Sequence, residues 1–274
     1  MISVLILTKN EAQDLPGCLQ SISWCDDIHV FDSFSDDETV TIAKKYGAIV
    51  TQRKFDNYAS QRNSALDHLV FKYPWLFILD ADERTPEILI TELKELLINV
   101  DHNVSGFRIR RKDFLNDTWL KYSQISPFYI RLIRVGKARY HREINEVLEV
   151  DGDVLETIGY FNHYPFSKGY FHWLNKHNMY SNMEAKRWIE ENDNNIEFSL
   201  KKAFFSKDFS EKRYHQKGLF YKMPGRPILK LGYLLFWRMA FLDGSAGFIY
   251  STLQAIYEYF IVLKTKELIY EKQQ

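Results

Sequence analysis

Apolar and polar positions alternate on two different periods over the first hundred residues. Short, nearly continuous apolar runs, long enough for one buried strand each, cover 2–8, 27–32, 47–51 and 75–80. Segments with apolar residues at helical spacing follow them at 11–24, 36–46, 57–73 and 85–98. Strands that alternate with helices predict an α/β fold with a mostly parallel central sheet.

Capping residues set the expected helix starts. Ser35 or Asp36 offers an N-cap for the second helix. Thr85 offers one for the fourth, with Pro86 in the first helical position, where its missing N–H costs nothing.

The pattern of apolar and polar residues changes after the fourth helix. From Ser105 onward, mixed apolar and polar runs at 106–110, 129–133 and 145–150 predict an antiparallel extension of the sheet. After Tyr164-Pro165 the pattern becomes helical and rich in Lys, Tyr and Trp. We therefore expect an α/β domain over 1–165 and a helical C-terminal region over 166–274.

Charge and composition exclude two classes of protein. The 36 basic and 36 acidic residues cancel, so the chain lacks the positive field of proteins that bind nucleic-acid phosphates. The chain opens directly on an apolar strand, and its longest uncharged stretch, from Gly244 to Tyr257, is shorter than the ~20 residues of a spanning helix. We expect a cytoplasmic protein that does not bind nucleic acid and has no membrane span.

Three carboxylates follow the last apolar run, in Leu79-Asp80-Ala81-Asp82-Glu83. Ligands of open α/β sheets bind at this carboxyl edge, and clustered carboxylates suit Mg²⁺ or Mn²⁺ bridging to a diphosphate. The small Ala81 lets the chain turn between the two aspartates. A solvated acidic turn is the plain alternative. A phosphatase would need Thr in the fifth position of this motif, where Arg84 stands.

Three further polar segments should reach the same edge. Thr8, Asn10 and Glu11 follow the first strand, Asp32 and Ser33 end the second, and Gln61, Arg62 and Asn63 lie in the third helix. Asp32 could accept a hydrogen bond from a uracil-type imide, and a cation at 62 would face phosphates. For Ser35 and Asp36 we favour helix capping, and an exposed polar helix face is an equal alternative for 61–63.

These motifs, in this order, resemble the nucleotide-binding half of the inverting family 2 glycosyltransferases of GT-A (Rossmann-like) fold. The matching stretches are Ser-Val-Leu-Ile-Leu-Thr-Lys-Asn-Glu-Ala, Val-Phe-Asp-Ser-Phe-Ser-Asp-Asp-Glu-Thr, Ala-Ser-Gln-Arg-Asn-Ser-Ala and Leu-Asp-Ala-Asp-Glu. His163-Tyr164-Pro165-Phe166 and Phe241-Leu242-Asp243-Gly244-Ser245-Ala246-Gly247 extend the resemblance towards bacterial lipopolysaccharide-core β-glucosyltransferases.

The resemblance implies transfer of a hexose, with glucose the first candidate, from a UDP-sugar to a hydroxyl of a glycan or lipid-linked saccharide. Asp82 would bind Mg²⁺ or Mn²⁺, Asp80 would support the metal or the ribose, and His163 is a further candidate ligand. Arg131 matches a position near the donor or acceptor. Glu146 is the candidate base, with Glu143 as its rival, although His-Glu is more usual than Asn145-Glu146.

The C-terminal region carries basic residues among aromatic and aliphatic ones from Lys222 to Phe241. Such a composition suits contact with the inner membrane surface, and the resemblance to enzymes with lipid-linked acceptors favours that interpretation. Packing on the catalytic domain or a homo-oligomer interface is the alternative.

Two other function classes share some of these features. A sugar nucleotidyltransferase would need a metal and a nucleotide pocket, but it usually opens with a Gly-rich phosphate loop, which is absent after Leu7. A membrane-bound assembly protein with a nucleotide-sugar fold would bind the donor without turnover.

Overall fold

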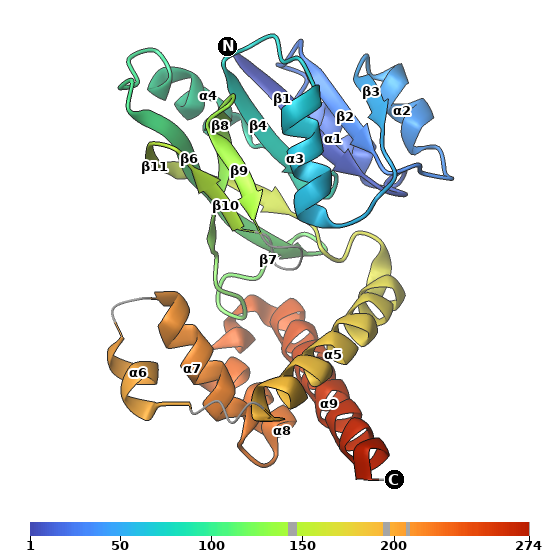
Figure 1. Ribbon diagram of the computed structural model, residues 1–274, viewed down its shortest axis with the longest axis vertical. Coiled ribbons are helices and arrows are strands. Elements are labelled where there is room, and N and C mark those ends of the chain that lie inside the picture. The colour runs from blue at the N-terminus through green and yellow to red at the C-terminus, as the bar shows by residue number, and fades with distance from the viewer. Residues whose placement is uncertain (142–146, 194–197, 207–208, 274) are drawn as a thin grey trace. The chain divides into compact units, whose positions relative to one another are not determined.

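The computed structural model describes residues 1–141, 147–193, 198–206 and 209–273 (Figure 1). The chain divides into two compact units. Unit 1 comprises Met1–Asp117 and Ser126–Ser167, and unit 2 comprises Thr118–Ile125 and Lys168–Gln274. Residues 118–125 therefore leave the α/β unit and return to it, which the sequence pattern does not indicate.

Unit 1 is built on a sheet whose strands run in the order β3-β2-β1-β4-β8-β6-β11-β5. The first four of these pair in parallel, β8 runs antiparallel between β4 and β6, and β11 pairs in parallel with β6. The bounds are β1 Ile2–Thr8, β2 Ile28–Asp32, β3 Ile49–Gln52, β4 Trp75–Asp80, β5 Glu83–Arg84, β6 Val104–Leu115, β8 Phe128–Arg134 and β11 Asp153–His163. The predicted α/β fold with a mostly parallel central sheet is confirmed.

Both faces of this sheet are covered. Ile2, Val4 and Ile6 of β1 pack against α1 Leu15–Ser21, α2 Thr39–Lys45 and α4 Glu87–Leu96. Leu5 faces the other way, against α3 Tyr58–His68 and the antiparallel strands β9 Ala138–His141 and β10 Val147–Val150 (Figure 1). Burial on both faces explains why β1, β2 and β4 are nearly continuous apolar runs, since most of their side chains are shielded from water.

The helices of unit 1 are shorter than the sequence pattern predicts. The expected caps are wrong, because α2 begins at Thr39 with Glu38 as N-cap, and α4 begins at Glu87 with Pro86 as N-cap. The Ser35 hydroxyl instead donates to Asp32 and accepts from the Asn10 N–H. In the sequence, polar groups that have partners elsewhere in the unit look the same as helix-capping groups.

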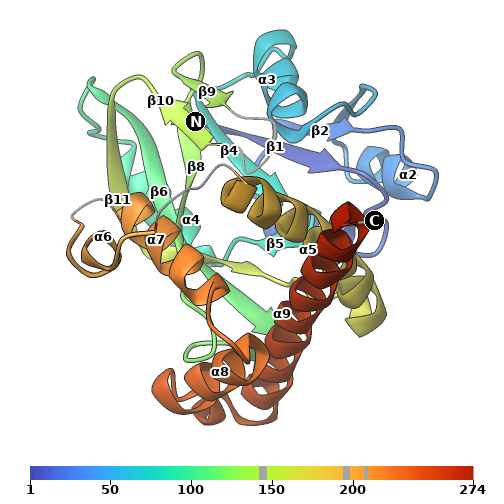
Figure 2. The same ribbon diagram turned by 60° about the horizontal axis from the view of Figure 1, so that its bottom comes forward.

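Unit 2 is helical apart from the short strand β7 Thr118–Trp119. Its helices are α5 Gly169–Asp193, α6 Leu200–Phe205, α7 Phe209–Tyr221, α8 Arg226–Gly232, the π-helix η1 Tyr233–Trp237, the 3₁₀ helix η2 Ala240–Asp243 and α9 Gly244–Gln273. Helix α9 packs along α5 and α8 (Figure 2). The buried Asp243 carboxylate accepts from the backbone N–H groups of Tyr122 and Ser123, which holds segment 118–125 in this unit.

Within the described residues, one helix, Ala240–Lys272, is long and apolar enough by length and composition to cross a membrane. A third of its most apolar window is buried. Two charged side chains tie it to its neighbours in unit 2: Glu258 lies 3.4 Å from Arg226, and Lys264 donates to the Ser181 hydroxyl. A single helix of this kind is a weak indication of a membrane span.

Candidate donor-binding site

The ends of three neighbouring strands bring the predicted polar residues to one edge of unit 1. Thr8 of β1 lies opposite Asp32 of β2, and Leu7 lies opposite Asp80 of β4. The pairing is parallel and in register, so the carboxyl ends of the strands meet there. This is the edge at which open α/β sheets bind ligands.

Asp80 is held between two arginines. Arg62 of α3 donates to its Oδ1 and Arg131 of β8 to its Oδ2, each at 3.0 Å. Burial alone would raise the pKa of Asp80, but the two guanidinium groups outweigh it and hold the pKa well below its usual value. Asp80 is therefore a fixed anion that orients two cations at the end of β4.

Glu83 is the second carboxylate that pairs with Arg131. Its side chain is 1% exposed and accepts hydrogen bonds from Arg131 and from the backbone N–H of Asp80, the latter at 3.0 Å from Oε2. Burial raises the pKa of Glu83 to about 7, against the opposing effect of Arg131. Arg131 thus bridges two carboxylates of the same acidic motif.

Asp82, on the other side of the turn, faces His163. The His163 Nε2 lies 3.3 Å from Asp82 Oδ2, and its Nδ1 bonds to Asp113. Burial lowers the pKa of His163, but the two carboxylates outweigh it and raise the pKa to about 9. The strand register explains this geometry, since His163 pairs with Glu83 on one side and with Asp113 on the other.

These donors fit a divalent cation in part. A carboxylate oxygen and an imidazole nitrogen are ligands that Mg²⁺ or Mn²⁺ accepts, and metal at Nε2 would displace the His163 proton. Asp80, by contrast, has both oxygens on arginines. Among the described residues, no group of three His, Cys, Asp or Glu is placed to hold a metal by itself. A cation at Asp82 would take its remaining ligands from the donor.

Asp32 is buried and saturated with hydrogen bonds. Its Oδ1 accepts from the hydroxyls of Thr8 and Ser35, and its Oδ2 accepts from the Ser35 N–H and the Gln52 amide. Burial opposes ionisation, yet these donors hold the pKa of Asp32 below its usual value. A uracil ring could bond here only by replacing one of them, so base recognition by Asp32 stays a prediction.

The loop after β1 is bound to the loop after β2. Asn10 has a φ of +56°, its N–H donates to the Ser35 hydroxyl, and its side-chain oxygen accepts from the Asp36 N–H. The Glu11 N–H donates to the Thr39 hydroxyl. These contacts place both loops at the edge where the sequence predicts the nucleotide, with the Asn10 backbone in a conformation that Asn tolerates.

The predicted residues of α3 divide between two roles in the structure. Gln61 donates to the Ser33 hydroxyl at 3.0 Å, which ties α3 to the end of β2. Asn63 instead uses both ends of its amide on the backbone of Tyr140, donating to the carbonyl at 2.8 Å and accepting from the N–H at 2.9 Å. Arg62 reaches Asp80, as described above. Asn63 therefore anchors β9, and its role in donor binding stays a prediction.

The two candidate bases, Glu146 and Glu143, lie outside the described residues. Strand β9 ends at His141, immediately before them, and β10 begins at Val147, immediately after. The strand on which Asn63 acts therefore leads directly into the segment that carries Glu146.

The sequence pattern does not indicate the roles of two buried acids and one amide of the site. Glu83 is expected there only as part of the acidic motif, and no motif points to Asp113 or Gln52. Asp113 is 2% exposed on β6, opposite His163. A charged residue within an apolar strand is the signal that could have indicated Asp113, but its partner depends on the pairing of β6 with β11.

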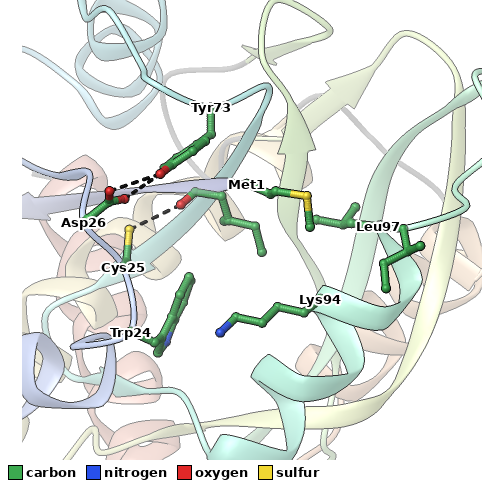
Figure 3. A pocket seen from close by; sticks show the side chains of 9 residues that line it. Met1, Trp24, Cys25, Asp26, Tyr73, Lys94 and Leu97 are labelled. Atoms are coloured by element: carbon green, nitrogen blue, oxygen red, sulfur yellow. Dashed lines mark hydrogen bonds between the residues drawn. The ribbon is translucent and has the colours of Figure 1, made fainter.

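A separate cavity of about 420 Å³ lies at the opposite edge of the sheet (Figure 3). Met1, Trp24, Tyr73 and Lys94 are among its lining residues. Ile2 and Trp75 mark the amino ends of β1 and β4 there, whereas the candidate site lies at the carboxyl ends. The cavity is therefore no part of the donor-binding site.

Replacing Arg131 by Met should lower the free energy of unfolding by about 3 kcal/mol, because the Asp80 and Glu83 carboxylates would lose the buried guanidinium that they share. Urea unfolding measures the loss. Arg108→Met is the matched control, since Arg108 and Glu156 form a half-exposed pair on the same sheet, worth under about 1 kcal/mol. Equal losses in both variants would contradict the role of Arg131.

Known glycosyltransferases resemble the chain over most of its length. The lipopolysaccharide core biosynthesis glycosyltransferase LpsC of Rhizobium meliloti is 30% identical over 199 residues, covering 69% of this chain and 72% of that protein. An uncharacterized glycosyltransferase of Rickettsia bellii is 25% identical over 232 residues, covering 78% of this chain and 77% of its own.

The fold is also that of a known glycosyltransferase. The mannosyltransferase PcManGT of Pyrobaculum calidifontis, solved with GDP-Man and Mn²⁺, superposes with a TM-score of 0.52 at 15% identity, covering 96% of this chain and 86% of that one. The family model for glycosyl transferase family 2 matches residues 3–154, which hold the sheet apart from most of β11, together with Asp32 and the Asp80-Ala81-Asp82 turn. The chain is therefore a glycosyltransferase and belongs to glycosyl transferase family 2.

Proposed function

We propose that this enzyme transfers a hexose from a UDP-sugar, with inversion, to a hydroxyl of a glycan or lipid-linked saccharide. Asp82 beside His163, next to the arginine-bound Asp80, is the observation that carries the donor half of the proposal. The likeness to LpsC supports a role in lipopolysaccharide or other cell-envelope polysaccharide synthesis. The branch resemblance supports glucose as the first sugar to test.

The charges of the site support a metal-assisted departure of the diphosphate. Arg62, Arg131 and a protonated His163 face the three carboxylates of the acidic motif, so three positive charges oppose at most three negative ones. Mg²⁺ or Mn²⁺ bound at Asp82, with His163 as a second ligand, would neutralise the leaving diphosphate. Thr8, Asn10, Glu11 and Ser33 then line the nucleotide side.

Glu146 serves as the base in this proposal. Its carboxylate takes the proton of the acceptor hydroxyl as the oxygen attacks the anomeric carbon, and the bond from that carbon to the diphosphate oxygen breaks with its electron pair on UDP. Attack opposite the leaving group inverts the configuration. Glu143 remains the rival, since it lies in the same segment.

A lipid-linked acceptor would place the enzyme at the inner face of the cytoplasmic membrane. The exposed apolar side chains of unit 2 support such peripheral contact.

A screen of nucleotide-sugars tests the donor assignment. We expect slow hydrolysis of a UDP-hexose in the presence of Mn²⁺, little with GDP- or ADP-sugars, and at least about a hundredfold loss after EDTA treatment, because the metal stabilises the leaving group. Release of the free nucleotide is the measurement. Turnover that is unchanged by EDTA contradicts the metal, and the absence of turnover with every donor favours a non-catalytic assembly protein.

A further inference from the structure

Large apolar side chains are concentrated on the surface of unit 2 around η1. Ten of them between residues 228 and 249 are exposed, and we call them the apolar surface: Ile228, Leu229, Tyr233, Phe236, Trp237, Met239, Phe241, Leu242, Phe248 and Ile249. Trp237 is 79% exposed and Phe236 is 76% exposed. Single exposed apolar residues are ordinary, but so many within one short segment mark a surface that contacts something.

The backbone puts several of these residues on one side. Helix α8 runs into η1 without a break, since Tyr233 keeps helical dihedral angles. Leu229, Tyr233 and Trp237 are four residues apart, so they lie along one side of this continuous helix, and Phe236 is exposed next to Trp237 in the chain. The wider π-helical turn at 233–237 keeps Tyr233 and Trp237 close together.

A basic pocket adjoins the same residues. Its volume is about 360 Å³, and its lining residues are Lys121, Tyr122, Tyr233, Trp237, Arg238 and Met239. The Arg238 guanidinium is fixed by donating to the carbonyls of Tyr122 and Gln124, at 3.1 and 3.3 Å. The Lys121 ammonium lies 5.3 Å from the Tyr122 ring centroid. Two cations and three aromatic rings thus line one hollow beside the apolar surface.

Acidic groups are nearly absent from this stretch. Between residues 222 and 257 the chain has four basic residues, Lys222, Arg226, Lys230 and Arg238, and one acid, Asp243. Asp243 is buried, and its carboxylate binds the N–H groups of Tyr122 and Ser123. Residues 222–257, all of which are described, therefore carry no exposed carboxylate that would repel an anionic partner.

We propose that the apolar surface docks on an anionic phospholipid bilayer, with the phosphate of one lipid headgroup in the pocket of Lys121 and Arg238. Phe236 and Trp237 lie below the headgroups, where aromatic side chains are favoured, and the two cations lie at headgroup level. This docking specifies how the enzyme would contact the membrane, and the membrane location itself rests on the proposed function. A dimer through the same surface is less favoured, because an isologous contact would bring two copies of the basic pocket into one interface.

Vesicle flotation of the full chain tests this docking. Vesicles of phosphatidylcholine with phosphatidylglycerol should carry the protein, pure phosphatidylcholine should carry little, and added salt should weaken binding. Phe236→Ser combined with Trp237→Ser should lower the bound fraction about tenfold or more, because two inserted aromatic side chains are lost. Lys121→Gln should lower it about fivefold, the contribution of one lysine near an anionic surface.

Two controls separate docking from general effects. Phe171→Ser removes an aromatic side chain that is 80% exposed on α5, and Lys201→Gln removes an exposed cation on α6, so both variants should float like the wild type. Trp237 is the only exposed one of the six tryptophans, all of which are described, so its fluorescence should shift to the blue on vesicles.

The outcomes distinguish this proposal from the function of unit 1. UDP-hexose hydrolysis without lipid should be unchanged in the Phe236/Trp237 variant. If the wild type did not hydrolyse a UDP-hexose, that result would contradict only the proposed reaction and not the docking. The docking proposal is overturned if the wild type stays unbound, if Phe171→Ser lowers binding equally, or if the double variant breaks a dimer that ignores vesicles.

Discussion

Replacing Asp82 by Asn should lower Mn²⁺-stimulated turnover of the sugar donor about a thousandfold. Asn keeps the shape of the side chain but loses the negative charge that faces His163 and would bind the cation. Metal stabilisation of a leaving group contributes several kcal/mol, and about 4 kcal/mol corresponds to this factor. Release of UDP from the donor at saturating Mn²⁺ is the measurement.

Asp117→Asn is the control for this prediction, because Asp117 is an exposed carboxylate of the same unit. It should behave as the wild type. Thermal unfolding of both variants checks that the fold is kept, since the bond from His163 to Asp113 does not depend on Asp82. Metal-stimulated turnover at the wild-type rate in Asp82→Asn would show that the metal is bound elsewhere.

Replacing Glu146 by Gln should lower sugar transfer to the acceptor about a thousandfold while donor binding stays unchanged. Gln cannot take a proton from the acceptor hydroxyl, and general base catalysis contributes roughly 10²–10⁴-fold. Transfer is measured with saturating donor, and donor affinity is measured separately by titration with UDP.

Glu143→Gln is the matched variant, three residues earlier in the same segment. A loss confined to Glu146→Gln supports Glu146 as the base, and a loss confined to Glu143→Gln assigns the base to Glu143. Wild-type transfer in Glu146→Gln would contradict the proposed mechanism, whatever the effect at 143.

The central strands could be predicted closely because they are buried on both faces. Strands β1 and β4 begin and end where the apolar runs at 2–8 and 75–80 do. Helix ends could not, because polar groups near them have distant partners. Residues 69–73 continue the helical pattern, yet α3 ends at His68, and the N–H groups of Lys72 and Tyr73 bond to Asp27 and Ser3.

The candidate site divides in the same way. The meeting of Thr8, Asp32 and Asp80 could be predicted from the sequence, since parallel strands bring their carboxyl ends to one edge. The partner of each charge could not. That Asp80 is bound by Arg131, and that Asp113 orients His163, depends on β8 and β11, which arrive from later in the chain.

The sequence by itself determined the α/β order, the buried strands and the position of the acidic turn, because hydrophobic periodicity and turn chemistry act over a few residues. The tertiary structure alone decided that Asp80 is neutralised by two arginines while Asp82 faces His163. It also decided that 118–125 joins unit 2 beside Arg238. Such pairings depend on strand register and chain crossing, which no local pattern records.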